Sequence, residues 1–474
     1  MDDRGRQLMC QKYNTTQVPS NFCTFAPIEI MKTILLLGAG RSSGSLIKYL
    51  LQKSESKDFK LLIGEKEVHL AEEKIRGHHR GMAFSLDILD AGQRGEAIMK
   101  ADVVISLLPP ALHLHAATDC LRYGKHLVTA SYISPEIKAL DDEARAKGLL
   151  FLNECGLDPG IDHMSAMEII HRLQAEGATL TLFQSYTGGL VAPESNDNPW
   201  GYKFTWNPRN VILAGQGTAR YIRNGKYHYI PYPRLFSESV RIEVDGLGRF
   251  DGYANRDSLS YRHHYGIEQI PTLLRGTLRY EGYCSAWQVF VTLGITDDTF
   301  TIENSERMTY RAFIEAFIPP SVMGSTLEER LARYCGIDPE GPSMERIIST
   351  GILEDKTIGI KDASPARILQ HLLEQKWVLK EGDKDMIVMQ HLFEYTTAEG
   401  TSKKLTSSLV VKGDDTIQTA MAKTVGLPLG IAAVHVLEGK FKSTGVHLPV
   451  LKEMYEPILQ ELETLQIRFT ENIS

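Results

Sequence analysis

Short apolar runs alternate with amphipathic segments through the first third of the chain. The first run, residues 32–37, leads directly into a glycine-rich turn, and leucines at helical spacing follow it. Five more runs follow, with helical stretches between most of them, at 59–64, 82–88, 102–108, 126–130 and 149–152. Strands buried on both faces of a parallel sheet are apolar throughout and need crossover helices. The pattern therefore predicts a doubly wound parallel α/β sheet.

The pattern changes after about residue 165. Apolar or alternating runs at 179–186, 239–244 and 387–397 predict a second sheet, in which 404–412 pairs with 386–395. The region between residues 300 and 380 is mainly helical in its spacing, with helices expected at 308–316, 326–334, 344–350 and 365–374. Residues 415–435 predict a long apolar helix interrupted at Gly426-Leu427-Pro428, and 450–465 predict the last helix.

Composition narrows the class of protein. The chain has 474 residues, 43% of them hydrophobic and 23% charged, which suits two or three globular domains. A formal net charge of -7 argues against a nucleic-acid partner. Six scattered cysteines without a C-x-x-C pair predict reduced thiols rather than disulfides or a zinc site. We expect a cytoplasmic protein with no membrane partner, because no apolar run approaches the ~20 residues needed to span a bilayer. Residues 1–30 contain no apolar signal-peptide core and predict a disordered tail or an upstream start.

The glycine turn after the first strand predicts a dinucleotide site. Gly38 permits a tight exit from the strand, and Gly40 leaves room for a pyrophosphate to approach the backbone. A helix starting near Ser42 would direct its amide groups at the phosphates. The spacing is one residue longer than the usual fingerprint, with Gly44 as the third glycine.

The second strand ends in Gly64-Glu65-Lys66, which bears on the choice of cofactor. A carboxylate at this position accepts hydrogen bonds from the ribose hydroxyls of NAD and repels the 2′-phosphate of NADP. Lys66 could instead neutralise that phosphate, and both charges could also be solvated loop residues. The sequence modestly favours NAD over NADP.

Two turn-rich blocks crowd carboxylates into a few residues, at 153–163 and 192–199. The first follows a strand, and the carboxyl ends of such strands are where open α/β folds bind ligands. Asp158 lies between Leu157 and Pro159 and is suited to orienting an amine or acting as a base, although a turn or helix cap is the alternative. Asp162 and His163 fall at the start of the next helix, where capping explains Asp162 better than catalysis does.

Other candidates follow the fourth and fifth strands. His113 is better explained as a structural imidazole than as a catalytic one, and Tyr132 suits either proton relay or packing. Arginines in the second half, at 255–257 and in the glycine-interrupted run 275–280, could bind carboxylates in bidentate fashion. They indicate an anionic amino-acid substrate, although surface arginines without function are common.

The chain resembles the saccharopine dehydrogenase family, specifically the L-glutamate-forming enzyme, from about residue 32 to its end. The motifs that carry the resemblance are Val104-Ile105-Ser106-Leu107-Leu108-Pro109, Thr129-Ala130-Ser131-Tyr132-Ile133-Ser134-Pro135, Gly156 to His163, Gly188 to Glu194, Tyr202 to Trp206, Asn255 to Ser258 and Arg275 to Tyr280.

The resemblance implies three domains after a tail at 1–30. They are a Rossmann-type domain at 31–163 rejoined by roughly 415–474, a mixed α/β substrate domain at 164–300 and 380–414, and a helical domain at 301–379. The implied reaction is the reversible, NAD(P)-dependent oxidation of saccharopine to L-glutamate and 2-aminoadipate 6-semialdehyde, by hydride transfer and imine hydrolysis and without a metal. A homodimer is expected.

The resemblance also implies site residues. Cofactor-binding positions are Gly38, Ala39, Gly40, Arg41, Ser42, Glu65, Lys66, Leu86, Asp87, Leu107, Ala130 and Ser131. Substrate-binding positions are Tyr132, Ile133, Asp158, Arg256, Thr277, Leu278 and Arg279, of which Tyr132 and Asp158 are the catalytic candidates.

Three positions depart from the family pattern. Pro110 replaces an aromatic residue, Thr187 stands where relatives carry a cysteine proposed for acid–base chemistry, and Glu65 replaces an uncharged residue seen in NADP-using relatives. A related C–N oxidoreductase, such as a carboxynorspermidine-type reductase, would need the same cofactor and arginines. A non-catalytic dinucleotide-binding sensor is the alternative from another class.

Overall fold

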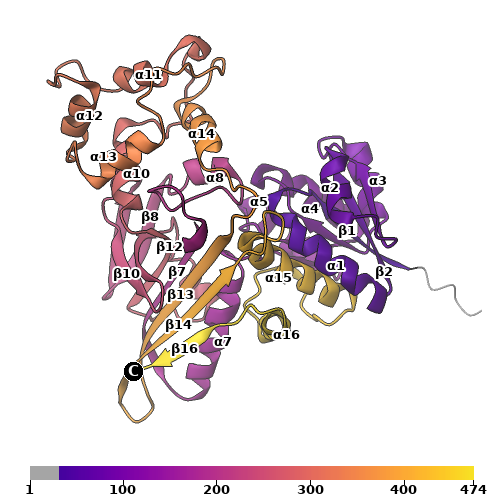
Figure 1. Ribbon diagram of the computed structural model, residues 1–474. Helices are drawn as coiled ribbons and strands as arrows, with labels where there is room; N and C mark the ends of the chain where they lie inside the picture. The colour runs from indigo at the N-terminus through magenta and orange to yellow at the C-terminus, as the bar shows by residue number, and fades with distance from the viewer. Residues whose placement is uncertain (1–30) are drawn as a thin grey trace, which may run out of the picture. The chain divides into compact units, whose positions relative to one another are not determined.

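The structure is a computed structural model that describes residues 31–474 (Figure 1). Predictions for the first 30 residues, including the tail, Cys10 and Cys23, lie outside the described residues. Residues 32–474 form one compact unit. The four cysteines within it, Cys120, Cys155, Cys284 and Cys335, are free thiols.

The first sheet is parallel throughout and has the order β15-β6-β5-β4-β1-β2-β3. The chain thus starts in the middle, moves outwards to β3, crosses back to β4 and continues to the other edge. This reversal confirms the predicted doubly wound fold. The strands are β1 (Lys32–Leu37), β2 (Phe59–Glu65), β3 (Gly81–Ser85), β4 (Val103–Ser106), β5 (His126–Thr129), β6 (Leu150–Leu152) and β15 (Gly445–His447).

Helices connect these strands and cover the sheet. They are α1 (Gly44–Ser56), α2 (Val68–Ile75), α3 (Ala91–Met99), α4 (His113–Tyr123), α5 (Pro135–Lys138) and α6 (Asp141–Ala146). The side chain of Asp90 caps α3 by accepting from the amides of Gly92 and Gln93. A short 3₁₀ turn at Arg41–Ser43 precedes α1, so the regular helix begins two residues later than the sequence suggests.

Helix α15 (Ala420–Leu437) returns from the far end of the chain and packs against α1. The expected interruption is absent, because α15 continues through Gly426 and contains Pro428. A Cβ at Gly426 would lie 2.9 Å from the backbone nitrogen of Leu46, so the glycine permits the close approach of the two helices. Among the described residues, α15 alone is long and apolar enough to cross a membrane, but it is 89% buried inside the protein, as a core helix is.

The second sheet is mixed and has the order β10-β11-β12-β7-β13-β14-β16, with the hairpin β8–β9 attached to β12. Strands β7 and β12 are parallel, and β13 and β14 pair in antiparallel fashion from Met386↔Lys412 to Thr396↔Ser402, as predicted. The strands are β7 (Thr179–Val191), β8 (Thr218–Arg223), β9 (Lys226–Pro231), β10 (Val240–Val244), β11 (Gly248–Ala254), β12 (Thr272–Tyr280), β13 (Asp385–Thr396), β14 (Ser402–Lys412) and β16 (Thr470–Ile473).

The last strand, β16, pairs with β14. The final residues therefore belong to the second sheet rather than to the first domain, where the expected boundary of 415–474 puts them. Helix α7 (Ile161–Ala175) leads from the first sheet to the second and packs on α16 (Lys452–Thr464).

The mainly helical segment follows β12, and in Figure 1 it lies beyond α8. Its helices are α10 (Tyr283–Leu293), α11 (Tyr310–Ala316), α12 (Leu327–Cys335), α13 (Pro342–Ser349) and α14 (Pro365–Lys376), while α8 (Pro208–Ile212) and α9 (Tyr261–His264) are short helices of the second domain. Trp200, Trp287 and Trp377 are fully buried in one core that this segment shares with the second sheet. The Rossmann-type sheet, the mixed sheet and the helical insertion are the architecture predicted from the sequence.

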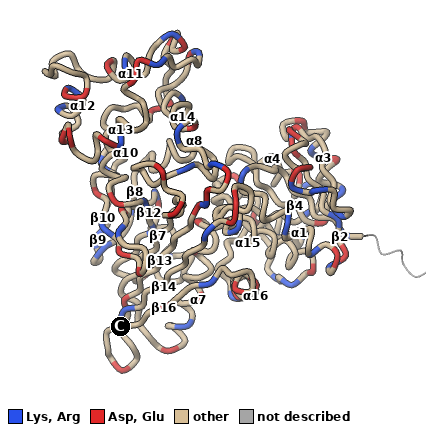
Figure 2. Tube along the Cα trace, viewed as in Figure 1, with Lys and Arg blue, Asp and Glu red and all other residues tan. Residues whose placement is uncertain are grey.

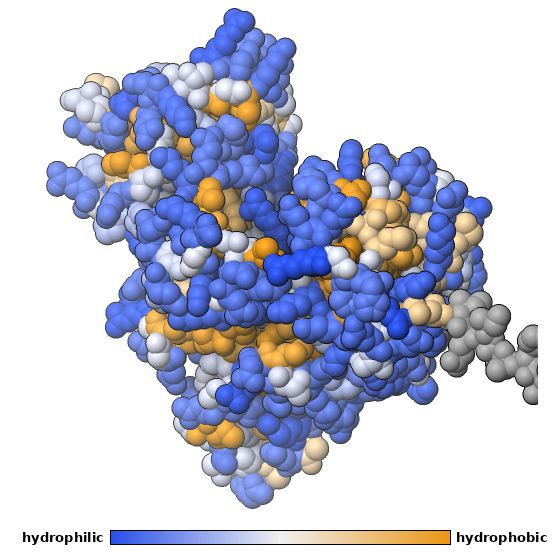
Figure 3. Space-filling view, turned by 45° about the vertical axis from the view of Figure 1, so that its right-hand side comes forward, coloured by the Kyte–Doolittle hydropathy of each residue, from blue (hydrophilic) through white to orange (hydrophobic). Residues whose placement is uncertain are grey.

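The surface carries both signs of charge. Lys and Arg are interspersed with Asp and Glu along the trace of the described residues (Figure 2). The face in Figure 3 is mainly hydrophilic, and its apolar residues lie in separate patches. The expected homodimer stays a prediction.

Candidate active site

One cavity of about 1800 Å³ lies at the carboxyl ends of the first sheet's strands and is closed from the other side by loops of the second domain. Its first wall includes the glycine turn and the segments that follow β2, β4 and β5. Its second wall includes Trp206, Arg256, Tyr261, Arg275 and Thr277. The position at the reversal of strand order is where doubly wound folds bind dinucleotides.

The glycine turn fits a pyrophosphate. Gly38 has φ +95°, a conformation that strongly favours glycine, and its amide donates to Gly64 O at 3.0 Å. A Cβ built on Gly40 would meet nothing within 4 Å, so the backbone here faces open space. Lys74 Nζ donates to the carbonyls of Ala39 and Gly40 and fixes the turn from behind. This open backbone, directly after the central strand, fits the phosphates of a dinucleotide.

Glu65 lies beside this turn but does not extend freely into the cavity. Its Oε2 accepts from the amide of Ala39 at 2.6 Å, and its Oε1 accepts from the amide of Lys66 at 2.8 Å. Lys66 and Arg41 also line the cavity, and Lys66 has no ion-pair partner among residues 31–474. The cavity therefore has one cation, Lys66, beside the bound carboxylate at the end of β2, while Arg41 Nη1 lies 3.4 Å from Phe204 O.

His113 is a buried residue with both ring nitrogens engaged. Its Nδ1 lies 2.8 Å from the hydroxyl of Ser106, and its Nε2 lies 2.6 Å from that of Ser131. Burial lowers the pKa of His113 to about 4. The imidazole is neutral near neutral pH and ties the ends of β4 and β5 together, which agrees with its structural interpretation.

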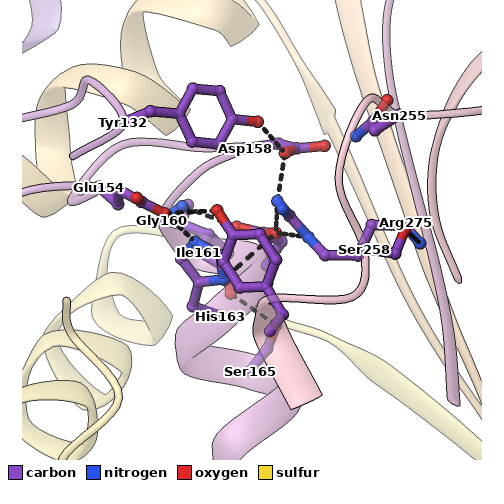
Figure 4. A network of polar contacts seen from close by, with 12 residues as sticks. Tyr132, Glu154, Asp158, Gly160, Ile161, His163, Ser165, Asn255, Ser258 and Arg275 are labelled. Carbon is purple, nitrogen blue, oxygen red and sulfur yellow. Dashed lines mark hydrogen bonds and ion pairs between the residues drawn. The ribbon is translucent and has the colours of Figure 1, made fainter. Parts of the chain in front are cut away.

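A buried carboxylate–guanidinium cluster forms the opposite side of the site (Figure 4). Arg275, on β12 and 2% exposed, donates from Nη2 to Asp158 Oδ1 at 2.8 Å and to Asp162 Oδ2 at 2.6 Å. Its Nε also lies 3.2 Å from Asp162 Oδ2. Asp162 Oδ1 accepts from the amide of Gly160 at 2.7 Å. The N-cap residue of α7 is Gly160, whose lack of a side chain leaves the helix without a side-chain cap, so Asp162 is not the expected N-cap but the partner of an arginine in the other domain.

A second chain of contacts runs behind this cluster. His163 Nε2 lies 2.9 Å from Glu154 Oε2, and its Nδ1 lies 2.6 Å from the hydroxyl of Tyr265. Tyr261 donates to the same Glu154 oxygen at 2.9 Å, while Glu154 Oε1 accepts from the amide of Ile133. Burial opposes ionisation of Glu154, but the hydrogen bond and charge of His163 hold the pKa of Glu154 below its usual range. The segment 153–163 is thereby fixed to both sheets.

Asp158 and Tyr132 line the cavity, as do Glu154, Tyr261 and Arg275 of the same network. Tyr132 is 45% exposed, and its hydroxyl lies 3.5 Å from Asp158 Oδ1. Burial and the neighbouring Asp162 raise the pKa of Asp158 to about 6, against the opposing effect of Arg275. Loss of water around the hydroxyl of Tyr132, which lies against this cluster, raises the pKa of Tyr132, and the charge of Asp158 raises it further, so the phenol keeps its proton near neutral pH. One carboxyl group that titrates near neutrality, beside a protonated phenol, thus opens onto the cavity.

Most sequence-predicted residues are brought together here. All cofactor candidates except the buried Ala39 line the cavity, as do Tyr132, Ile133, Asp158, Arg256 and Thr277. Leu278 and Arg279 do not line it; both are buried, and the Arg279 guanidinium lies over the rings of Tyr202, Tyr253 and Tyr283. Strand alternation explains Leu278, because successive side chains point to opposite faces of β12. Arg279 shares a face with Arg275 and Thr277 but lies further along the strand, among the three tyrosine rings.

The second turn-rich block, 192–199, lies outside the cavity lining. Glu194 pairs with Lys412 at the end of β14, and Asp197 pairs with Lys203 and with Lys380, which precedes β13, so its carboxylates tie the segment after β7 to the neighbouring strands. Sequence reasoning also missed the partners of Asp158. Arg275 is 117 residues away from Asp158 in the sequence, and the only signal that points to it is the glycine and the second arginine in the run 275–280.

Together, a Rossmann-type sheet, an open glycine turn and an acid–base cluster across one cavity define a dinucleotide-dependent oxidoreductase. The comparisons with known proteins agree. Residues 34–152 match the family model described as the saccharopine dehydrogenase NADP binding domain, and residues 156–467 match the saccharopine dehydrogenase C-terminal domain. The chain belongs to the saccharopine dehydrogenase family.

Individual relatives cover most of the chain. The saccharopine dehydrogenase [NADP(+), L-glutamate-forming] of Pyricularia oryzae is 32% identical over 91% of this chain and 96% of its own length. The mitochondrial alpha-aminoadipic semialdehyde synthase of Bos taurus is 35% identical over 93% of this chain, which spans 47% of that longer protein. The solved apo saccharopine dehydrogenase (L-Glu forming) of Saccharomyces cerevisiae superimposes with a TM-score of 0.83 and 31% identity, covering 94% of this chain and 100% of that one.

Proposed function

We infer that this protein catalyses the reversible, nicotinamide-dinucleotide-dependent oxidation of saccharopine to L-glutamate and 2-aminoadipate 6-semialdehyde, a reaction of lysine metabolism. The observation that carries this function is the cluster around Asp158, which faces the glycine turn across one cavity in a member of this family. When bound, the nicotinamide supplies the hydride acceptor or donor. The residues of the chain must then handle the proton and hold the carboxylates of the substrate.

We propose Asp158 as the group that exchanges a proton with the substrate amine. Its pKa of about 6 lets it accept a proton near neutral pH and return it. Tyr132, 3.5 Å away and protonated, donates a hydrogen bond to that carboxylate or to the substrate. Arg256 lines the cavity without an ion-pair partner in the described part of the chain and is suited to a substrate carboxylate.

We propose NADP as the cofactor, which corrects the modest preference for NAD drawn from Glu65. The family model and the Pyricularia oryzae relative carry NADP in their names. In this chain, the carboxylate of Glu65 is bound by the amides of Ala39 and Lys66, while the Lys66 cation lines the cavity beside it. A lysine without an ion-pair partner among the described residues, next to a carboxylate that is already hydrogen-bonded, favours a 2′-phosphate.

The first test mixes the full chain with saccharopine and follows reduced nicotinamide by absorbance, with NADP and NAD in parallel. Saccharopine-dependent reduction, weakened at least tenfold by Asp158→Asn with cofactor affinity unchanged, is expected. Activity on carboxynorspermidine but not on saccharopine would show that the proposed substrate is wrong. Cofactor binding without turnover of either compound would indicate a sensor.

The cofactor has its own test. Lys66→Ala should raise the KM for NADP about tenfold and leave the KM for NAD within twofold, because it removes one charge-assisted phosphate contact. Lys60→Ala, on the strand that Lys66 follows and outside the cavity lining, is the matched control. If the wild-type enzyme prefers NAD, the proposed cofactor is wrong, whereas the proposed reaction is unaffected.

A further inference from the structure

We propose that Asp162 and Arg275 form a positioning pair that holds Asp158 and controls how readily it exchanges a proton with the substrate. This inference rests on the proposed function, because it assigns Asp158 to proton transfer. Neither Asp162 nor Arg275 is expected to touch the substrate amine. They act through the carboxyl group that does.

The geometry makes Asp162 the permanent partner of Arg275. Asp162 is 1% exposed, and its Oδ2 is approached by both Nε and Nη2 of Arg275 at 3.2 and 2.6 Å. Its other oxygen is fixed by the amide of Gly160 at the start of α7. Although burial opposes its ionisation, the charges of His163 and Arg275 hold the pKa of Asp162 below its usual range. Asp162 therefore stays ionised where Asp158 titrates.

Arg275 is equally constrained on its own strand. Its amide donates to Ser258 Oγ at 2.8 Å, and its guanidinium lies 4.1 Å from the centre of the Tyr261 ring. With Nε and Nη2 committed to Asp162, the guanidinium offers Asp158 only a share of Nη2, at 2.8 Å. Asp158 is thus held by a cation whose charge another carboxylate already balances.

The consequence is a pair of opposed influences on Asp158. Burial and the charge of Asp162 favour its protonated form, and Arg275 favours its ionised form, with the net result of a pKa of about 6. The other titratable groups that face it are Tyr132, Glu154, His163, Tyr253 and Tyr265. A reversible reaction needs both forms of Asp158, since amine oxidation requires a proton acceptor and the reverse direction requires a donor.

The test is the pH profile of kcat/KM for saccharopine oxidation by the full chain and its variants. Asp162→Asn removes the carboxylate charge that repels Asp158, and the charge of Arg275 is then balanced by Asp158 alone. The midpoint of the acidic limb should therefore move to lower pH by roughly one unit. Arg275→Lys offers one compact cation in place of a fork, and pairing with the buried Asp162 should leave Asp158 weakly held. Its acidic limb should therefore move up by a similar amount.

Two further variants complete the design. Asp158→Asn should abolish the limb, which identifies the titrating group. Asp119→Asn removes one carboxylate of the buried Arg94–Asp119 pair, 2.7 Å long and outside the cavity, and should leave the midpoint of the limb unchanged.

The outcomes are separable. Opposite shifts in Asp162→Asn and Arg275→Lys support the proposal, because a merely structural loss would lower turnover without moving the limb in either direction. Shifts of the same sign, or an unmoved limb in either variant that folds, would overturn it. Wild-type protein without saccharopine-dependent turnover would instead reject the proposed function.

Discussion

The sharpest prediction concerns two glycines of one turn. Gly40 has φ -66°, which any residue adopts, and a Cβ there would meet nothing within 4 Å. Gly38 has φ +95°, and its Cβ would lie 3.0 Å from Leu107 O. Gly40→Ala should therefore leave the free energy of unfolding within about 0.5 kcal/mol of wild type. Gly38→Ala should cost about 1–3 kcal/mol through backbone strain.

Gly40→Ala should weaken cofactor binding although it leaves the stability of the protein unchanged. If the pyrophosphate passes over Gly40, the added methyl group displaces it from the amide groups of the turn. Loss of one or two charge-assisted hydrogen bonds, at about 1.5–3 kcal/mol each, corresponds to a Kd raised at least tenfold. Gly40→Ala should thus be a folded protein with a selective defect in binding.

The assay combines thermal denaturation of the protein alone with fluorescence titration of the reduced cofactor. We expect Gly40→Ala to melt within about 2 °C of wild type and to bind the cofactor at least tenfold more weakly. A Gly40→Ala protein with wild-type Kd would show that the phosphates do not approach this turn. The dinucleotide assignment of the cavity would then lose its structural basis.

Two other predictions concern stability. Gly426→Ala places a Cβ 2.9 Å from Leu46 N and Cβ, so it should lower the free energy of unfolding by about 1–3 kcal/mol; an unchanged urea midpoint would refute the close packing of α15 on α1. Burial lowers the pKa of His113 to about 4 in the folded protein, whereas it is about 6.5 in the unfolded chain. As the pH falls from ~6.5 to ~4, the unfolded chain takes up a proton on this residue and the folded protein does not, so up to about 3 kcal/mol of stability is lost. His113→Gln should therefore show a shallower dependence of the urea midpoint on pH across this interval, and equal slopes would contradict the assignment.

Six strands of the first sheet were predictable from local pattern because each is an apolar run flanked by a turn, whereas the three-residue β15 (Gly445–His447) was not predicted. Strand β12 was not, because Gly276 and two arginines interrupt its pattern. The structure supplies the reason for the glycine. A Cβ at Gly276 would lie 2.6 Å from the Tyr186 ring and 2.7 Å from Tyr253 O, so the residue serves packing between strands rather than a turn.

The residue types of the site could be predicted from the sequence, but only some of their interaction partners could. Asp158 was identified from its turn, whereas Asp162 was interpreted as a helix cap although it lies inside α7, whose N-cap residue is Gly160. The ion pair of Asp162 with Arg275 joins residues 113 positions apart. Turn chemistry also misplaced the block 192–199, because the same Asp, Asn and Pro residues that shape a ligand-binding loop can also close a strand end.

The segment 153–163 explains why the site depends on both sheets. It leaves β6, and the amides of Glu154 and Cys155 donate to the carbonyls of Ser131 and Thr129 at the end of β5, which anchors it to the dinucleotide domain. Its other end enters α7, where Asp162 binds Arg275 of the second sheet. Asp158 lies between these two anchors. Its position relative to the glycine turn is therefore set by how the two domains meet, and the acid–base group is placed by the junction rather than by either fold alone.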